Sequence, residues 1–277
     1  IRRQRSLTWV VEYMADQKTD DHSFAAAQAF ILEAKKYWTT EIYPALKTEY
    51  RDKVARTGHE PQSVADVSEL LADSDLYKTY AWLERHLQRF KYSGRYGLAP
   101  YHRERRDELV AAVAKTARPQ ELELAPGLDL PTDYKAVDIH QHPGGVWRDD
   151  FAAHVYERGA RSTTPMLGGR HRDLHQRFSD LVAASGRPER ILDMGCGFGK
   201  STLPFCEVFP DSLVEAIDLS GPCVAYGAAS AAEAQVQNIR FRQMNAYETD
   251  YSDDEFDLVT STMLIHELPP KQIEAMF

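Results

Sequence analysis

Apolar residues in the first third of the chain recur every three or four positions, which is the spacing of one face of an α-helix. One such stripe contains Phe24, Ala27, Ile31, Ala34, Trp38 and Ile42. A second stripe contains Leu76, Tyr80, Leu83, Leu87 and Phe90. Pro44 lies between them and is expected to kink or end the first helix, because proline has no amide hydrogen. The pattern predicts a mainly helical N-terminal domain over residues 1–117.

This pattern breaks between residues 118 and 148, where turn-forming residues accumulate. They are Pro119, Pro126, Gly127, Pro131, Pro143, Gly144 and Gly145. Proline and glycine at this density preclude a long helix. We therefore predict an extended linker over residues 118–148, followed by a second domain over residues 149–277.

Short apolar runs alternate with helical stretches from residue 190 onward. The predicted strands cover residues 190–194, 213–217, 239–243 and 256–261, and the predicted helices cover 200–208 and 222–235. Strands that alternate with helices form parallel βαβ units, so the sequence predicts an α/β fold with a Rossmann-like, doubly wound parallel sheet. Residue 277 falls inside the helix after the fourth strand. We therefore expect the sheet to be incomplete, and we interpret the chain as a fragment of a longer protein.

A glycine-rich turn follows the first predicted strand, with the sequence Asp193-Met194-Gly195-Cys196-Gly197-Phe198-Gly199. Glycines are expected where a ligand lies directly against the backbone, because a Cβ atom would fill that space. The dinucleotide fingerprint G-x-G-x-x-G requires a glycine at the position of Lys200, and a P-loop requires one at the position of Met194. The turn therefore matches neither of these nucleotide-binding motifs.

The pattern D-x-G-x-G-x-G resembles that of class I S-adenosylmethionine-dependent methyltransferases, and further motifs of that family follow in order. Residues 215–220 contain the end of the second strand, whose last residue is the acid Asp218. Asn245-Ala246 follows the third strand, and residues 256–268 resemble the fourth-strand motif. The resemblance covers roughly residues 190–277 and implies that the chain binds S-adenosylmethionine. The cofactor-binding residues it implies are Asp193, Gly195, Cys196, Gly197, Gly199, Asp218, Leu219, Asn245, Ala246 and Thr262.

The resemblance also implies what these residues do. The three glycines form a floor under the methionine and ribose portions, and Asp193 lies near the ammonium group. Asp218 accepts hydrogen bonds from both ribose hydroxyls, as the ribose-binding acid of dinucleotide sites does. Asn245 and the backbone of Ala246 contact the adenine edge, and Thr262 lies near the transferable methyl group.

Candidate catalytic residues follow the fourth strand. A methyl group on a sulfonium is already activated, so the protein mainly has to orient a nucleophile and exclude water. A general base is needed only when the nucleophile must lose a proton. His266 and Glu267 lie where the family often places residues beside the substrate, and they are the candidates for this role. A histidine with a local hydrogen bond at the start of a helix is an equally good interpretation of His266.

Two upstream segments carry further candidates. His140 and His142 have the spacing of a metal-binding pair, but no constellation of carboxylates or thiols surrounds them in the sequence. We therefore predict no metal site and favour a pocket lining or a plain loop. In the family, a polar segment such as residues 158–170 often closes over the cofactor. Tyr156, Arg161 and Thr164 are its candidate hydrogen-bond donors, and an ordinary connection between helices is the alternative.

The composition bears on which molecules the protein binds and on the cell compartment in which it works. The chain has 42 acidic and 33 basic residues and a formal net charge of −9, whereas proteins that bind nucleic acid backbone usually have a basic surplus. The three cysteines form no CxxC pair, which fits a reducing cytoplasm. The longest apolar stretch, around residues 24–32, is far shorter than the roughly 18 residues of a membrane span. We expect neither a nucleic acid partner nor a membrane span.

The leading hypothesis is a cytoplasmic S-adenosylmethionine-dependent methyltransferase that acts on a small organic acceptor. A methyltransferase that acts on protein or nucleic acid is one alternative. The Pro-Pro motif of amino-directed nucleic acid enzymes is absent, since the corresponding residues are Ser261-Thr262-Met263-Leu264. A non-catalytic S-adenosylmethionine-binding module is the other alternative. The sequence does not define the acceptor or the methylated atom, and it is compatible with a homodimer.

Overall fold

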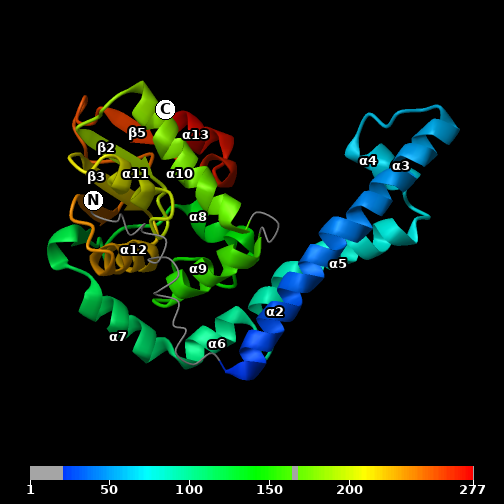
Figure 1. Ribbon diagram of the computed structural model, residues 1–277, viewed down its shortest axis with the longest axis horizontal. Coiled ribbons are helices and arrows are strands. Elements are labelled where there is room, and N and C mark those ends of the chain that lie inside the picture. Colours follow the sequence, from blue (N-terminus) through cyan, green and yellow to red (C-terminus); the bar gives the residue numbers. More distant parts are fainter. Residues whose placement is uncertain (1–20, 164–167, 277) are drawn as a thin grey trace, which may run out of the picture. The chain divides into compact units, whose positions relative to one another are not determined.

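The computed structural model of the chain describes residues 21–163 and 168–276. Contacts along the backbone divide these residues into two compact units, 21–100 and 101–276, which are coloured blue to cyan and green to red in Figure 1. Helix α6 (Leu98–Glu104) contains the boundary between them. Among the helices of the described residues, none combines the length and the apolar character that a membrane span requires.

Helices make up the first unit. They are α2 (His22–Tyr37), the π-helix η2 (Trp38–Ile42), α3 (Tyr43–Thr57), α4 (Val64–Leu70) and α5 (Asp75–Tyr92). Both predicted stripes contribute to the core, since Ile31, Trp38 and Leu87 are buried together with Tyr80 packed beside them. Trp38 Nε1 also donates a hydrogen bond to Glu84 Oε1 at 2.9 Å. The predicted helical character of this part is confirmed.

Pro44 does not end the helical path through this unit. It lies in the first turn of α3, where the missing amide hydrogen of proline costs least. The turn before it, η2, is π-helical, and the N–H of Tyr43 donates to the carbonyl of Trp38 five residues earlier. A π-helical turn is one of the recognised ways in which a helix absorbs a local break in its hydrogen-bond pattern.

The second unit is built around a parallel sheet of five strands. They are β1 (Leu122–Glu123), β2 (Arg190–Met194), β3 (Leu213–Asp218), β4 (Ile239–Gln243) and β5 (Leu258–Thr260). Their order across the sheet is β1-β4-β3-β2-β5, and every pair is parallel. The predicted α/β fold with a Rossmann-like parallel sheet is confirmed. Its four predicted strands are all present, with bounds that differ by no more than two residues.

The fifth strand comes from residues 118–148, which the sequence analysis assigns to an extended linker. In β1, Leu122 pairs with Phe241 and Glu123 with Arg242. The Glu123 carboxylate also accepts hydrogen bonds from the guanidinium groups of Arg240 and Arg242, the second at 3.0 Å. The same segment contains η3 (Pro119–Glu121), α8 (Thr132–Ala136) and η4 (Ile139–Gln141). This segment is therefore part of the sheet-containing unit, and β1 extends the sheet beyond β4.

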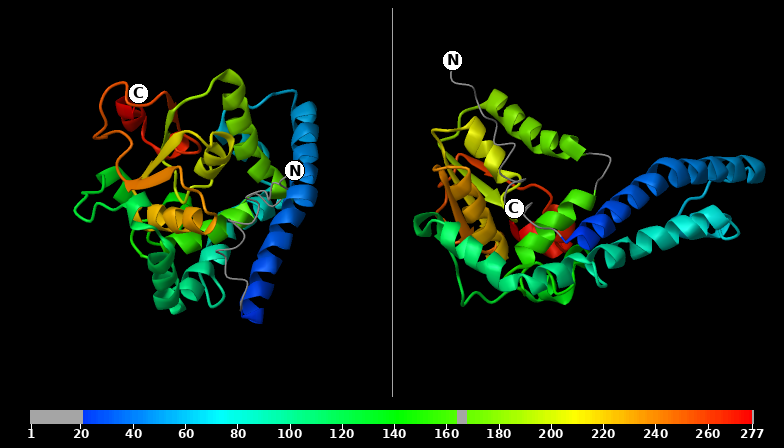
Figure 2. Two further views of the ribbon diagram at one scale, coloured as in Figure 1. Left: turned by 60° about the vertical axis from the view of Figure 1, so that its left-hand side comes forward. Right: turned by 60° about the horizontal axis from the view of Figure 1, so that its bottom comes forward.

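Apolar side chains of the strands divide between the two faces of the sheet. Helices α10 (Gly168–Ser185), α11 (Thr202–Val208) and α12 (Gly221–Glu233) pack on one face, around Ile191, Val214 and Phe241. On the other face, Leu192 and Ile217 pack with Met276 of α13 (Pro270–Met276). Both faces are covered, as is typical of parallel sheets (Figure 2).

Helices α7 (Arg106–Thr116) and α9 (Ala152–Thr163) pack against α12. Val113 of α7 contacts a cluster that includes Phe198 and Tyr226. Helix α7 lies within residues 1–117, the predicted N-terminal helical domain, but it packs with the unit that contains the sheet. The functional division of the chain into domains stays a prediction.

Candidate functional site

The carboxyl ends of β2, β3, β4 and β5 meet at one edge of the sheet, because all four strands are parallel. Each of them is followed by residues that the sequence analysis assigns to the cofactor. Gly195 follows β2, Leu219 follows β3, Asn245 lies just beyond β4, and Thr262 lies just beyond β5. This edge is where open α/β sheets bind ligands. The structure therefore brings the implied cofactor-binding residues together.

The glycine-rich turn between β2 and α11 has a left-handed backbone at Gly195, Gly197 and Gly199, with φ values of 72°, 53° and 86°. Gly195 and Cys196 anchor the turn, since both N–H groups donate to the carbonyl of Ile217. A Cβ atom on Gly195 would lie 2.7 Å from the side chain of Leu264, and one on Gly199 would lie 2.9 Å from the ring of Phe241. Neighbouring side chains therefore require these two glycines.

Gly197 differs from the other two glycines of the turn. A Cβ atom there would meet only Cε1 of Tyr156, at an ordinary distance of 3.6 Å. Tyr156 in turn packs edge to face on Phe198, with ring centroids 5.4 Å apart. Open space at the Cβ position is thus found at Gly197, while Gly195 and Gly199 accommodate the protein's own side chains. Binding of the cofactor by the three glycines stays a prediction.

Asp218 links the glycine-rich turn to the next helix. Its Oδ2 atom accepts a hydrogen bond from the N–H of Gly197 at 2.9 Å, and its Oδ1 atom accepts one from the N–H of Ser220 at 2.8 Å. Burial raises the pKa of this carboxyl to about 6, and the two backbone hydrogen bonds oppose that rise. Asp218 is therefore mostly ionised at neutral pH and is held beside Gly197.

Asp193 is fully buried, and hydroxyl groups of the protein donate hydrogen bonds to its carboxylate. Its carboxylate accepts hydrogen bonds from Thr202 Oγ1 at 2.6 Å, from Ser201 Oγ at 3.1 Å and from Thr260 Oγ1 at 3.1 Å. Burial raises the pKa of this group, and the three hydroxyl donors oppose the rise. Asp193 thus connects β2 to the start of α11 and to β5. Its proposed place near the cofactor's ammonium group stays a prediction.

We expect Asp193→Ala to lower the free energy of unfolding by about 2–4 kcal/mol, because three buried hydroxyl groups lose their acceptor. Asp193→Asn retains the shape of the side chain and one acceptor oxygen, so it should lower the free energy of unfolding by only about 1 kcal/mol. Urea unfolding followed by circular dichroism measures both values. If the asparagine variant folds normally but loses S-adenosylmethionine affinity by more than about 100-fold, a direct contact with the cofactor is favoured over the purely structural role.

The remaining cofactor candidates have different surroundings. Asn245 is buried, and its Oδ1 atom accepts a hydrogen bond from the N–H of Tyr247 at 3.3 Å. Ala246 packs against the apolar cluster that contains Met244. The Oγ1 atom of Thr262 is buried with no hydrogen-bond partner, which is unusual for a hydroxyl group and marks a place where a ligand atom can bind.

Two further predicted residues bear on the chemistry of the turn. The carbonyl of Leu219 accepts a hydrogen bond from Gln243 Nε2 at 3.1 Å, which fixes the backbone after β3. Cys196 is buried, and burial raises the pKa of its thiol well above the usual value. A buried thiol of this kind is inert as a nucleophile. Among the donors predicted upstream, Thr164 and the side chain of Arg161 lie outside the described residues.

Tyr134 is a buried residue that the sequence does not assign to this edge of the sheet, and it is a further candidate for the site. It lies in α8, and its pKa is raised by burial and by the charges of Asp218 and Glu267. The tyrosine is therefore close to the carboxylates at the edge of the sheet. A single tyrosine in a proline-rich segment carries no recognisable motif, so only the fold could place it there.

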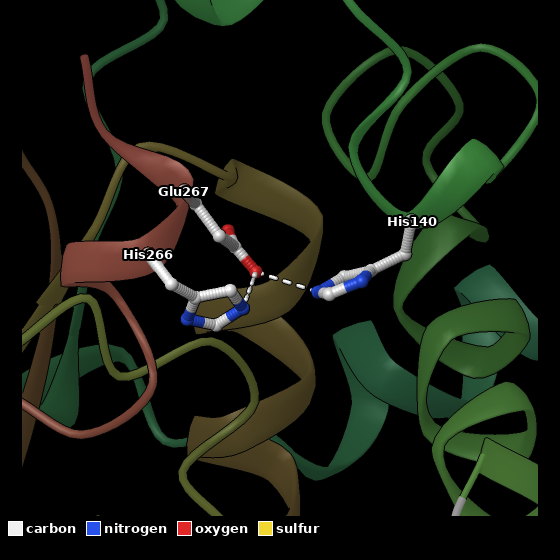
Figure 3. A group of neighbouring side chains, drawn as sticks. All are labelled: His140, His266 and Glu267. Atoms are coloured by element: carbon white, nitrogen blue, oxygen red, sulfur yellow. Dashed lines mark hydrogen bonds and ion pairs between the residues drawn. The ribbon is translucent and has the colours of Figure 1, made fainter. Parts of the chain in front are cut away.

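His140, His266 and Glu267 form a group at the same edge of the sheet. Glu267 Oε1 lies 2.7 Å from His140 Nε2 and 3.8 Å from His266 Nε2. Figure 3 shows the carboxylate of Glu267 directed between the two imidazole rings, whose centroids are 5.8 Å apart. His142, the other member of the predicted pair, is buried and is not part of this group.

A family comparison agrees with this geometry. Residues 191–277 match the model of a family described as a methyltransferase domain. These residues are a class I methyltransferase domain. The match includes the glycine-rich turn, Asp218, Asn245, Thr262 and the segment that carries His266 and Glu267.

Similar proteins match part of this chain. An uncharacterized protein of Rickettsia prowazekii is 33% identical over 70 residues, which are 25% of this chain and 28% of that protein. A trans-aconitate 2-methyltransferase of Deinococcus radiodurans is 32% identical over 107 residues, 35% of this chain and 39% of that protein. The YcgJ protein from Bacillus subtilis, known from a crystal structure, is 28% identical in sequence. The match covers 31% of this chain and 38% of the YcgJ chain, with a TM-score of 0.28. This chain spans less than two fifths of the length of each of these three proteins.

Proposed function

We propose that this chain is an S-adenosylmethionine-dependent methyltransferase that transfers the methyl group in line to a small organic acceptor. The observation that carries the proposal is the Asp218 carboxylate beside Gly197 at the carboxyl edge of a methyltransferase domain. A carboxylate has about four acceptor positions, and backbone N–H groups use two of them here. The others have the capacity to accept both hydroxyls of a ribose.

The residues of the site fit the parts of such a cofactor. Gly197 offers backbone without a Cβ atom, and Asp218 offers a charged acceptor for ribose. Asn245 and Ala246 supply amide and backbone groups for an adenine edge, and the hydroxyl of Thr262 lies without a partner just beyond β5. S-adenosylmethionine supplies an activated methyl group on a sulfonium. The protein then contributes mainly by orienting the acceptor and excluding water.

We assign His266 and Glu267 to the acceptor side of this site. Both follow β5, and Glu267 contributes to the electrostatic environment of Asp218. When the acceptor is a hydroxyl group, its proton must leave, and the imidazole of His266 is suited to take it. When the acceptor is a thioether, a tertiary amine or another group without a proton, no base is needed and the two residues position it.

The acceptor class is supported by charge, sequence and one relative. The net charge of −9 disfavours a nucleic acid backbone as partner, and the Pro-Pro motif of amino-directed nucleic acid enzymes is absent after β5. The Deinococcus radiodurans relative is a trans-aconitate 2-methyltransferase, so its name gives a small organic acid as acceptor.

The described cysteines, Cys196, Cys206 and Cys223, are free and buried, which supports our placement of the enzyme in the cytoplasm. A homodimer stays a prediction.

The proposal is tested with the purified chain in two steps. Calorimetry with S-adenosylmethionine should show one binding site per chain. S-adenosylmethionine with a radiolabelled methyl group is then incubated with the chain and a cell extract that is separated by ultrafiltration. Label should enter the small-molecule fraction. Label only in the retained fraction indicates a protein or nucleic acid acceptor, and binding without any transfer indicates a non-catalytic module.

A further inference from the structure

Three side chains with metal-binding atoms converge from two segments that are more than 120 residues apart. His140 belongs to η4, and His266 and Glu267 belong to η5 (Ile265–Glu267), which follows β5. Within the part of the chain that the structure describes, they form the only group of at least three His, Cys, Asp or Glu side chains whose ligand atoms are close enough to share a metal ion. We propose that His140, His266 and Glu267 bind a divalent transition-metal ion of the zinc type.

The distances in the group are close to those that an ion requires. All three ligand atoms lie within 4.8 Å of one another. A tetrahedral Zn²⁺ ion about 2.0–2.1 Å from each ligand atom separates those atoms by about 3.3 Å. Glu267 Oε1 lies 2.7 Å from one imidazole nitrogen and 3.8 Å from the other, so these two separations bracket that value. Figure 3 shows the three side chains directed toward a common space, with the Glu267 carboxylate between the two imidazole rings.

The donor set selects the class of ion. Two imidazole nitrogens and one carboxylate oxygen suit Zn²⁺ and its neighbours Fe²⁺, Co²⁺ and Ni²⁺ better than the all-oxygen sites of Mg²⁺ and Ca²⁺. Three protein ligands leave at least one coordination position open, which is the arrangement of catalytic rather than structural zinc sites. The side chains of His140 and His266 are 41% and 49% exposed, so an ion can enter from solvent.

The position of His140 depends on an uncommon backbone conformation. Its φ angle is 54°, in the left-handed region that residues other than glycine seldom adopt. The surrounding loop is held by a hydrogen bond from the N–H of Gly144 to Asp138 Oδ2 at 3.2 Å. Strained backbone of this kind is concentrated at ligand-binding sites, and the residue that adopts it here has its imidazole against Glu267.

The location gives the ion a chemical role. Glu267 interacts electrostatically with Asp218 and with Tyr134, so the group lies near the site assigned to the cofactor. With the ion bound, His266 is a ligand and does not serve as the base, so the base role assigned to it above applies to the metal-free site. The bound ion, with an open position, would instead hold an oxygen of the acceptor and withdraw charge from it as a Lewis acid. This role rests on the proposed methyl transfer, whereas binding of the ion does not depend on it.

The test uses the full chain, freed of metal with a chelator. Calorimetric titration with ZnCl₂ should show one equivalent bound, and titration with CoCl₂ should produce visible absorption bands of tetrahedral or five-coordinate Co²⁺. His140→Ala, His266→Ala and Glu267→Gln should each weaken Zn²⁺ binding by at least about 10–100-fold, since the loss of outer-shell residues alone has effects of that size. His59→Ala, at an exposed histidine of the first unit, is the matched control and should bind Zn²⁺ like the wild type.

Thermal unfolding separates loss of ligation from loss of structure. Zn²⁺ should raise the unfolding temperature of the wild type and of His59→Ala, but not that of the three ligand variants, whose metal-free unfolding temperatures should match the wild type. The proposal is wrong if the wild type binds neither Zn²⁺ nor Co²⁺, or if His266→Ala and Glu267→Gln retain wild-type affinity. The group is then a hydrogen-bonded cluster only. Calorimetry with S-adenosylmethionine on metal-free protein tests the proposed function separately, because that binding does not require the ion.

Discussion

Replacing Asp218 by alanine should lower the affinity for S-adenosylmethionine by about 10²- to 10⁴-fold, because two charge-assisted hydrogen bonds of about 1.5–3 kcal/mol each are lost. Asp218→Asn keeps the shape of the side chain but not its charge, so we expect its loss of affinity to be smaller than that of Asp218→Ala. Calorimetry at pH 8 measures all three proteins. Asp253→Ala, at an exposed acid near β5, is the matched control and should bind like the wild type.

The pH dependence of binding gives this prediction a second readout. The pKa of Asp218 is raised to about 6 in the ligand-free protein, and the ionised form is the one that accepts two ribose hydroxyls. Affinity should therefore be constant above about pH 7 and should fall by up to about tenfold per pH unit below pH 6. Asp218→Asn should lack this decline. Unchanged affinity in Asp218→Ala, or the same decline in Asp218→Asn, would remove Asp218 from the site.

Replacing Gly195 by alanine should destabilise the fold by about 2–5 kcal/mol. A φ angle of 72° costs an L-residue about 1–2 kcal/mol, and a Cβ atom 2.7 Å from Leu264 adds an overpacking cost of about 1–3 kcal/mol. Gly197→Ala has a similar φ angle of 53° but meets nothing closer than 3.6 Å. It should therefore cost only about 1–2 kcal/mol. Urea unfolding monitored by circular dichroism measures both variants.

A double variant identifies the source of the larger effect. If the contact with Leu264 causes the difference between the two glycines, Gly195→Ala combined with Leu264→Ala should be more stable than the sum of the single effects predicts. Additive effects, or equal losses at Gly195 and Gly197, would show that the backbone conformation alone requires glycine at Gly195. Gly197→Ala should nevertheless weaken S-adenosylmethionine binding more strongly than its small effect on stability would suggest.

Much of the fold could be predicted from the alternation of apolar runs and helical stretches. The bounds of β2 and β4 agree with the sequence analysis, and β3 is one residue longer. β2 and β3 are buried over most of their length and are rich in apolar residues. In β4, the buried Ile239 and Phe241 alternate with arginines, which is the period of a strand. β1 could not be predicted, because two residues give no period and their pairing with Phe241 and Arg242 depends on the sheet already being present.

Prediction of the site was limited for a related reason. The edge of the sheet could be assigned from motifs, since Asp218 and the glycines occur at fixed positions after their strands. The sequence gives no sign of contacts between distant segments. His140 pairs with Glu267 and not with a neighbour in the sequence, and Leu264 occupies the space beside Gly195. Each of these contacts is a product of tertiary folding.

The pairing of β1 with β4 has a practical consequence for the smallest autonomous part of the protein. Trimming the chain to residue 191, where the family match begins, would remove β1, α7 and α9 together. Leu122 would no longer cover the cluster around Phe241, and Val113 would no longer cover Tyr226. Such a shortened protein would expose apolar surface to water and would lack Tyr134 and His140. The homology boundary is therefore not a folding boundary, and a fragment that keeps both of these apolar contacts has to begin before α7.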